Sequence, residues 1–449
     1  MGSNSTTFNQ FPTEILLLIL SELIPTFTFS GEKLSSPINE TELYQRQRTL
    51  STLSTIDRAW NEVITPYLYH GPYLFTTWQL RLFHHSLTIS PFLCAFVRCL
   101  FVQGEERRTR LGVRNMTLKP TPLLGLSVQH ILQHCTSLQS MILGFQNAIG
   151  FRDPYEDQAL YGAVVILHTC KQSNIRTSIQ TLHIDRLILH TDPLPISEQS
   201  FPNLHHLSFS DCRIGIESIL EDRFRLRSKS IFGRWTGSST DSTQPSGIRI
   251  LTFTNTIFAR NAAVFYFLQS NHFCRNLETL EFHHCVYHSI QSQRSSRLSH
   301  IHAVHLDDAS EADFFLMSSE LINVGLTGIK KLTLGPSASI RCIEWHTGVG
   351  RTWIIPSTLE TLTVQLGNVE VLDLAMDMLK GCFAVLSTSA EEEPPDTDSG
   401  GLSVILSVAN PDCHQRELTS FRSSMQSSTL REFTEWCGDR AITVKCELL

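Results

Sequence analysis

LHHLSFSDC, residues 204–212, places apolar residues at its first, fourth and sixth positions and a cysteine at its ninth. The stretch LETLEFHHC, residues 277–285, repeats the same frame. Alternation between the fourth and sixth positions predicts a β-strand with one buried face, because successive side chains of a strand point to opposite sides. Self-similarity at two places in a long chain predicts a repeat architecture.

Looser copies of the frame cover most of the chain. They start at residues 97, 138, 179, 248, 301, 329 and 359, and SVILSV at 403–408 is a late copy. The frame resembles the leucine-rich repeat over residues 97 to about 449. The resemblance implies an α/β fold, with a parallel sheet on the concave face of an irregular horseshoe, because several intervals exceed the ~20–29 residues of regular repeats. The alternative is an ordinary α/β domain, since an apolar-rich chain often contains L-x-x-L-x-L.

The N-terminal stretch FPTEILLLILSEL, residues 11–23, contains an unbroken apolar run from Ile15 to Leu20. The run is too short to span a membrane, which takes ~20 apolar residues, and no basic segment precedes it as in a secretion signal. Pro12 and Glu14 indicate a helix start, and a second helix is expected from Thr49 to Ile64, closed by Pro66. Two short helices cannot bury this much apolar surface between themselves. The surplus faces either the rest of the chain or a partner.

The N-terminal residues resemble an F-box. The motif reads Phe11-Pro12-x-Glu14-Ile15-x-x-x-Ile19-x-x-x-Leu23, then Leu50-x-x-Leu53-x-x-Ile56-x-Arg58-x-Trp60, and Pro66-Tyr67-Leu68-Tyr69 is similar to the continuation in fungal members. The resemblance covers residues 8–70 and implies a small all-α module that binds a Skp-type adaptor and, through it, a cullin ubiquitin ligase. The adaptor-binding positions would be Phe11, Pro12, Ile15, Leu16, Ile19, Leu23, Leu50, Leu53, Ile56 and Trp60.

The expected domain organisation follows from these two resemblances. It comprises a disordered tail at 1–7, the F-box-like module at 8–70, a linker helix region at 71–95 and the repeat-like domain at 96–449. Residues 26–48, longer than the usual link in an F-box, are expected to form a surface loop. Two further loops are expected at 222–247, which begins basic, and at 387–401, because both are too polar to bury.

Composition excludes several classes of protein. The chain has 449 residues, of which 41% are hydrophobic, and a formal net charge of -7, so bulk nucleic-acid binding is not expected. Its 12 cysteines are scattered without a C-x-x-C pair, which favours reduced thiols in the cytoplasm, the nucleus or both. Membrane association is not expected either.

The histidines raise the question of a metal or catalytic site. His283, His284, Cys285 and His288, with Cys274 nearby, form one candidate zinc set, and His300, His302 and His305 form another. In the repeat interpretation Cys285 points into the core while His283 points to the opposite face, so the two diverge. No P-loop, G-x-S-x-G or H-E-x-x-H motif occurs. We therefore expect no catalytic residue, metal or cofactor, and a His-rich metalloenzyme remains a minor alternative.

The strand frame also predicts a binding surface. Its third, fifth and seventh positions share the face opposite the core, and extended repeat faces commonly bind protein. The side chains expected to bind a protein substrate are His183, Asp185, His206, Ser208, Glu281, His283, His305, Asp307 and Lys331. The leading hypothesis is thus a substrate receptor of a cullin-type ligase, with no enzymatic activity of its own. The alternative is a repeat scaffold without the ligase, and the same side chains would also suit a merely solvated face.

Overall fold

A computed structural model represents the chain, and it describes residues 12–23, 40–74, 77–104, 122–145, 178–185, 188–189, 201–214, 247–258, 264, 267–268, 274, 276–287, 301–307, 328–349, 355–356, 358–367, 371–389, 402–408, 428–440 and 442–448. The chain divides into two compact units. The first contains residues 1–187 and 194–210, and the second contains residues 188–193 and 211–449. Both units combine a parallel β-sheet with helices, so the expected α/β class is confirmed.

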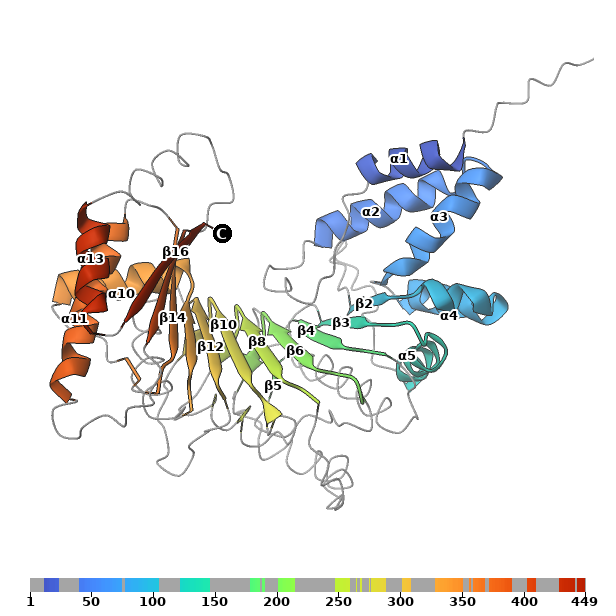
Figure 1. The fold of residues 1–449 in the computed structure, drawn as a ribbon. Helices are drawn as coiled ribbons and strands as arrows, with labels where there is room; N and C mark the ends of the chain where they lie inside the picture. Colours follow the sequence, from blue (N-terminus) through green and yellow to red (C-terminus); the bar gives the residue numbers. More distant parts are fainter. Residues whose placement is uncertain are drawn as a thin grey trace, which may run out of the picture. The chain divides into compact units, whose positions relative to one another are not determined.

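The first unit begins with helices and continues into strands (Figure 1). Its elements are α1 (Thr13–Leu23), α2 (Glu40–Leu53), α3 (Arg58–His70), β1 (Tyr73–Leu74), α4 (Thr77–Ile89), the 3-10 helix η1 (Pro91–Phe96), β2 (Cys99–Gly104), α5 (Pro122–His134), β3 (Ser140–Phe145), β4 (Thr181–Asp185) and β6 (His206–Ser210). The strands pair in parallel in the order β1-β2-β3-β4-β6.

The second unit contains a longer parallel sheet and a small accessory sheet. Its elements are β5 (Ile188–Leu189), β7 (Arg213–Ile214), β8 (Ile250–Thr254), β9 (Ile257–Phe258), β10 (Thr279–His283), β11 (Val286–Tyr287), β12 (Ala303–Asp307), β13 (Lys331–Leu334), α10 (Pro336–Val349), β14 (Thr361–Leu366), α11 (Leu372–Ser389), β15 (Ser403–Val408), α13 (Ser428–Gly438) and β16 (Thr443–Leu448). The main order is β8-β10-β12-β13-β14-β15-β16, and the accessory order is β11-β9-β7-β5. The main strands follow one another as a sheet that is not curled into the expected horseshoe (Figure 1).

The repeat frame determines where the strands begin. Every copy that starts between residues 97 and 359 has its strand beginning at its third position, as β6 does at His206 and β10 at Thr279. Fourth positions pair with fourth positions, so Leu280 of β10 lies beside Leu251 of β8 and Val304 of β12. These side chains are buried, as are those at the first and sixth positions. The in-register stacking therefore builds one continuous apolar face within each sheet.

A recurring turn explains the accessory sheet. Asp211, Asn255 and His284 each follow a main strand directly and adopt a positive φ, of 51°, 48° and 55° respectively. Asn, Asp and His tolerate this left-handed conformation better than most residues. The ninth position comes next in each copy and is buried, as Cys212, Thr256 or Cys285. A two-residue strand then follows, and these short strands pair with one another.

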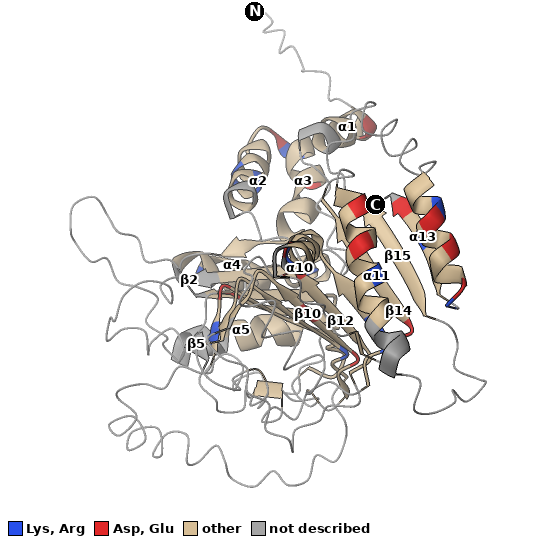
Figure 2. Ribbon diagram, turned by 90° about the vertical axis from the view of Figure 1, so that its left-hand side faces the viewer, with Lys and Arg blue, Asp and Glu red and all other residues tan. Residues whose placement is uncertain are grey.

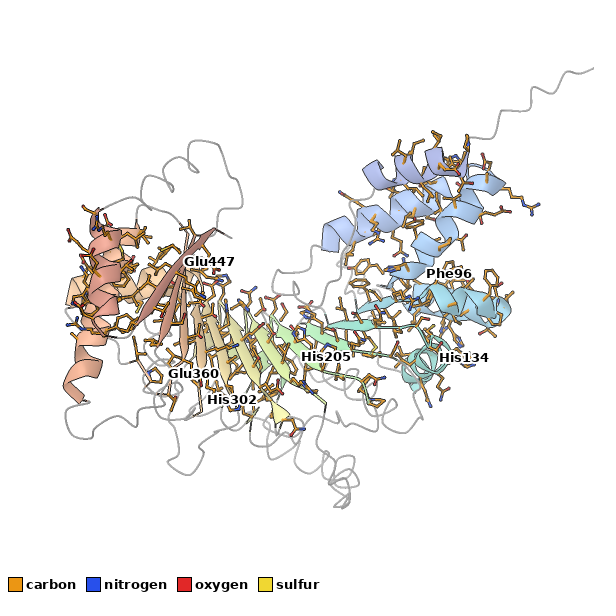
Figure 3. The ribbon with its side chains drawn as sticks, in the orientation of Figure 1. Phe96, His134, His205, His302, Glu360 and Glu447 are labelled. Atoms are coloured by element: carbon orange, nitrogen blue, oxygen red, sulfur yellow. The ribbon has the colours of Figure 1, made fainter. Side chains whose placement is uncertain are left out.

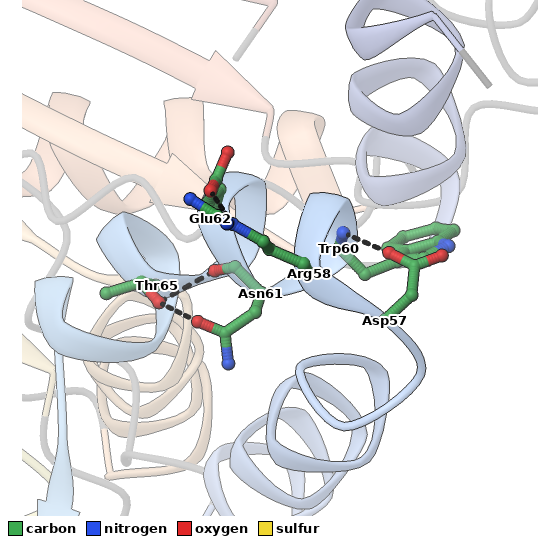
Figure 4. Close-up of polar contacts among 6 residues, drawn as sticks. All are labelled: Asp57, Arg58, Trp60, Asn61, Glu62 and Thr65. Carbon is green, nitrogen blue, oxygen red and sulfur yellow. Dashed lines mark hydrogen bonds and ion pairs between the residues drawn. The ribbon is translucent and has the colours of Figure 1, made fainter. Parts of the chain in front are cut away.

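The N-terminal helices differ from the expected ones. In place of one helix over 49–64, α2 ends at Leu53 and α3 starts at Arg58, where the Asp57 side chain accepts a hydrogen bond of 2.8 Å from the Trp60 backbone N–H (Figure 4). This hydrogen bond pairs one of the backbone N–H groups that have no partner within the first turn of a helix. Pro66 lies inside α3 and does not end it. Residues 40–48, expected in a loop, belong to α2, and residues 26–39 lie outside the described part.

The segment 71–95 is not a separate linker. Its strand β1 pairs with β2, and its helix α4 belongs to the same unit. Leu43 of α2 is buried in one cluster with Tyr73, Cys99, Phe101 and Ile142, so the helical module and the first sheet share a core. Of the other expected loops, 222–246 and 390–401 fall outside the described residues, as does the tail 1–7, while 387–389 form the end of α11.

Candidate protein-binding surfaces

The first three helices enclose a small core of their own. Leu20, Leu50 and Ile64 are buried together, with Leu53, Trp60, Val63 and Leu68 packed against them. Leu16 is also almost completely buried. Helix α1 therefore directs only part of its apolar surface inward.

The remaining apolar surface of α1 is exposed. The exposed fractions are 41% for Ile15, 39% for Leu17 and 63% for Leu18. Ile56, in the turn between α2 and α3, is 56% exposed. We call Ile15, Leu17, Leu18 and Ile56 the α1 surface. Ile15 and Leu18 are three residues apart and therefore lie on one side of α1. Neighbouring exposed apolar side chains indicate a protein-binding surface more often than isolated ones do.

The structure distributes the expected adaptor-binding residues over three environments. Pro12, Ile15 and Ile56 are exposed, Ile19, Leu53 and Trp60 are partly buried, and Leu16 and Leu50 are interior. Phe11 and the side chain of Leu23 lie outside the described part. Leu17 and Leu18 are exposed but are not among the adaptor-binding positions expected from the motif. The six-residue apolar run from Ile15 to Leu20 could have indicated their exposure. A helix cannot turn six consecutive apolar residues toward one core.

Polar contacts near this surface are local and structural. Arg58 Nε lies 2.9 Å from Glu62 Oε1 one turn along α3, and Thr65 Oγ1 donates a hydrogen bond of 2.7 Å to the Asn61 carbonyl oxygen (Figure 4). Both residues of the Arg58–Glu62 pair are largely exposed, so the pair contributes little to stability. The chemistry offered by the α1 surface is therefore apolar contact.

In the first unit, the expected substrate-binding side chains are mostly hidden. His183, His206 and Ser208 are buried, and Asp185 is partly buried. Burial, together with nearby His206, lowers the pKa of His183 to about 4. In this arrangement these imidazoles and this hydroxyl are hardly accessible to a substrate.

In the second unit, four of the outward positions form a polar cluster on neighbouring strands. Thr252 Oγ1 of β8 donates a hydrogen bond of 2.8 Å to Glu281 Oε2 of β10. His283 Nε2 lies 3.8 Å from the same carboxylate oxygen, and the His283 and His305 rings have centroids 4.6 Å apart. We call Thr252, Glu281, His283 and His305 the Glu281 cluster. Within the cluster Thr252 and His283 are buried, whereas the partly exposed Glu281 carboxylate and His305 imidazole can form hydrogen bonds with a partner.

The cluster favours an ionised Glu281 carboxylate beside a neutral His305 imidazole. Burial opposes ionisation of Glu281, but the contacts with His283 and Thr252 outweigh burial and lower its pKa. Burial is also the main reason why the pKa of His305 falls to about 4, with His283 adding to the effect. At neutral pH the Glu281 carboxylate is therefore ionised, which suits a cationic or hydrogen-bond-donating partner.

Asp307 and Lys331 differ from the cluster and from each other. Asp307 Oδ1 accepts a hydrogen bond of 2.9 Å from the Ser337 backbone N–H in the first turn of α10. A Cβ at Gly335 would overlap the Asp307 side chain, so the helix start approaches the strand closely. Asp307 is thus committed to holding α10, whereas Lys331 is exposed.

The candidate zinc residues are dispersed. Cys285 is buried, and its Sγ lies 3.4 Å from the Phe253 carbonyl oxygen, whereas the preceding residue, His284, is exposed. The His302 ring nitrogen Nδ1 lies 3.0 Å from the Gly328 carbonyl oxygen. His288 and His300 lie outside the described residues. Within the part of the chain that the structure describes, no three His, Cys, Asp or Glu side chains are arranged to hold a metal ion.

The remaining findings concern membrane-spanning helices and similarity to known proteins. Across the described helices, none combines the length and apolar character needed to cross a bilayer. No family model matches the chain, and no curated protein matches its sequence.

Proposed function

We propose that the chain is a substrate receptor of a cullin-type ubiquitin ligase, in which the N-terminal helices bind a Skp-type adaptor and the repeat sheet binds a protein substrate. The observation that carries the proposal is the α1 surface, where Ile15 and Leu18 are exposed on a helix whose opposite side packs on α3. Burying four such side chains in an interface would contribute several kcal/mol, at ~1.5–3 kcal/mol for each complete burial.

The arrangement of the chain supports this division of roles. F-box-like helices precede strands that follow the leucine-rich frame, the combination expected of a receptor with separate adaptor and substrate surfaces. On the substrate side we propose Glu281 and His305, which are partly exposed, and Lys331, which is exposed. Thr252 and His283 of the cluster are buried and contact Glu281. His183, His206 and Ser208 are left out of this proposal because they are buried.

The test is capture of a purified Skp-type adaptor by the full-length chain. Ile15→Asp with Leu18→Asp should weaken capture at least tenfold, because a charge in a desolvated apolar interface is costly. The matched control is Leu374→Asp, which places the same charge at an exposed leucine of α11. The melting temperature of both variants should equal that of the wild type.

Two results would contradict the proposal. Equal adaptor capture by the double variant and the wild type would show that the α1 surface is not the interface. Failure of the wild type to bind any Skp-type adaptor, while still retaining protein partners that depend on Glu281 or Lys331, would favour the scaffold without a ligase.

A further inference from the structure

Helix α4 is apolar on two faces. Leu80, Phe83 and Leu87 are buried, whereas Trp78 is 66% and Ile89 is 67% exposed. The exposed helices α11 and α13 of the second unit show the usual pattern, with acidic and basic residues along them (Figure 2). An exposed helix face normally carries mostly polar and charged residues. On the outer face of α4 large apolar side chains instead lie among the exposed Arg81, His85 and Thr88, and several such apolar side chains on one helix indicate an interface.

The exposed side chains form one strip. Trp78, Leu82 and Ile89 are separated by four and seven residues, so they lie along the same side of the helix. The strip continues onto η1 through Phe92, which is 65% exposed and meets the Phe96 ring edge-on at 6.4 Å between centroids. We call Trp78, Leu82, Ile89 and Phe92 the α4 strip.

The helix that carries the strip packs against α5. On the inner side of α4, the His84 ring meets the His130 ring of α5 edge-on, with centroids 4.5 Å apart, and His130 stacks on His134 at 4.0 Å. Figure 3 labels Phe96 of η1 and His134 of α5 among the side chains of this region. Elements packed in this way present a preformed surface, which lowers the entropic cost of binding.

The area of the strip limits what can cover it. Aromatic and large aliphatic side chains of this size and exposure offer together about 450 Å². A stable homodimer buries about 800 Å² on each partner, so this strip is too small to hold two copies of the chain together. Three or four apolar anchors in a line match the footprint of a single amphipathic helix.

The charges around the strip indicate which kind of partner helix it suits. Residues 63–104 and 122–145 contain no Asp or Glu, and their fixed positive charges are Arg81 and Arg98. Arg81 is exposed on the same side of α4 as Trp78 and Leu82. The nearest acidic residue upstream, Glu62 of α3, is already paired with Arg58 at 2.9 Å. An apolar strip with a positive margin is complementary to an apolar helix with acidic margins.

We propose that the α4 strip is a docking site for an acidic amphipathic helix of a partner protein. The site is distinct from the α1 surface and does not depend on adaptor binding. Trp78, Ile89 and Phe92 are the apolar anchors, and Arg81 selects carboxylates at the margin of the incoming helix.

The test uses displayed helical peptides of about sixteen residues, long enough for four turns. Their apolar positions are kept at helical spacing and the flanking positions are randomised. Selection on the full-length chain should enrich Asp and Glu over Lys and Arg at the flanks. The selected peptides should bind Trp78→Ala/Ile89→Ala at least tenfold more weakly, because central aromatic anchors carry most of such binding energy.

A second variant tests the charge. Arg81→Glu should weaken binding of the selected peptides about three- to tenfold, as the loss of an exposed ion pair would. The same variant should bind peptide versions that carry Lys in place of Glu. The control Leu374→Asp, at an exposed leucine of α11, should bind all of these peptides like the wild type. Leu82→Gln/Phe92→Gln should reproduce the loss if the first double variant fails to fold.

Other outcomes would overturn the proposal. One is enrichment of peptides without acidic flanks, or peptides that bind both double variants like the wild type. Another is Trp78-dependent sedimentation of the chain with vesicles of phosphatidylcholine and phosphatidylserine, which would make the strip a lipid-binding surface. A third is concentration-dependent dimerisation that Trp78→Ala/Ile89→Ala abolishes, which would assign the strip to a second copy.

Discussion

Asp307 illustrates how a pattern of alternation can assign a face without indicating the structural contacts of the side chain. As a seventh position of the frame it is expected to face a substrate. Its carboxylate instead binds the first turn of α10, where backbone N–H groups and the helix dipole favour a negative charge. The contact joins residues 30 positions apart in the chain, which strand periodicity cannot indicate.

We therefore expect Asp307→Ala to lower the free energy of unfolding by about 1–2 kcal/mol, as the loss of a helix cap does. Asp307→Asn should lose less, because the amide oxygen can still accept the hydrogen bond from Ser337. Denaturant unfolding of the variants measures both values. Lys331→Ala, at an exposed position, serves as the control, and an unchanged Asp307→Ala would show that the capping contact does not stabilise α10.

At the scale of the strands, burial of imidazoles links the sheet to pH. The pKa values of His183 on β4 and His305 on β12 fall from 6.5 to about 4 in the folded chain. Between these values the unfolded chain binds protons that the folded chain does not bind. Folding is therefore opposed increasingly as the pH falls from 6.5 toward 4.

The free energy of unfolding is expected to fall by on the order of 1–3 kcal/mol per histidine as the pH drops from 6.5 to 4. Above pH 7 no such decrease is expected. Urea unfolding at a series of pH values measures it. His183→Gln should flatten the dependence between pH 6.5 and 4, whatever its effect at neutral pH. A wild-type stability that stays level over this range would contradict the prediction.

At the scale of the whole first unit, the helical module and the sheet cannot be treated as independent. Leu43 of α2 lies among residues of β1, β2 and β3, and Gln47 Oε1 accepts a hydrogen bond of 2.6 Å from the Tyr73 backbone N–H. The expected boundary at residue 70 therefore cuts through a shared core. This unit extends well beyond helices α1 to α3.

Leu43→Asp should consequently destabilise the sheet of the first unit, by about 2–5 kcal/mol for a charge in a packed apolar cluster. Limited proteolysis should find new cleavage sites near β2 and β3 in this variant. Gln45→Asp places the same charge on the exposed side of the same helix and should leave the pattern unchanged. If β2 and β3 remain protected from cleavage in the Leu43→Asp chain, the helical module is separable from the sheet.

The sequence predicted the strands well and the helices less well, for a physical reason. Apolar side chains at the first, fourth and sixth positions are buried by neighbouring copies of the same frame, so each copy carries its own evidence for a strand. Helices α2 and α4 have no repeat to support them. The polar N-terminal half of α2 is helical although it reads as a loop, and α4 is apolar on both sides, so its pattern does not show which side is buried.

The functional surfaces were predictable only in part. The frame identified Glu281, His283 and His305 as neighbours on one face, which their in-register pairing confirms. It could not indicate that His183 and Ser208 on the same nominal face are buried, since burial there depends on packing remote in sequence. The exposure of Leu17 and Leu18 likewise follows from how α1 lies on α3.

The buried cysteines give the folded chain a resistance to oxidation. Among the cysteines that the structure describes, every one except the partly buried Cys446 is enclosed, and burial raises the pKa of Cys99 to about 12 and that of Cys437 to about 11. Oxidants and electrophiles attack thiolates, so they would react slowly with the packed chain. Once a unit opens, its sulfurs become reactive, and irreversible oxidation to the sulfonic acid would prevent repacking. Oxidative damage at these positions would therefore accumulate on chains that have already unfolded and would keep them unfolded.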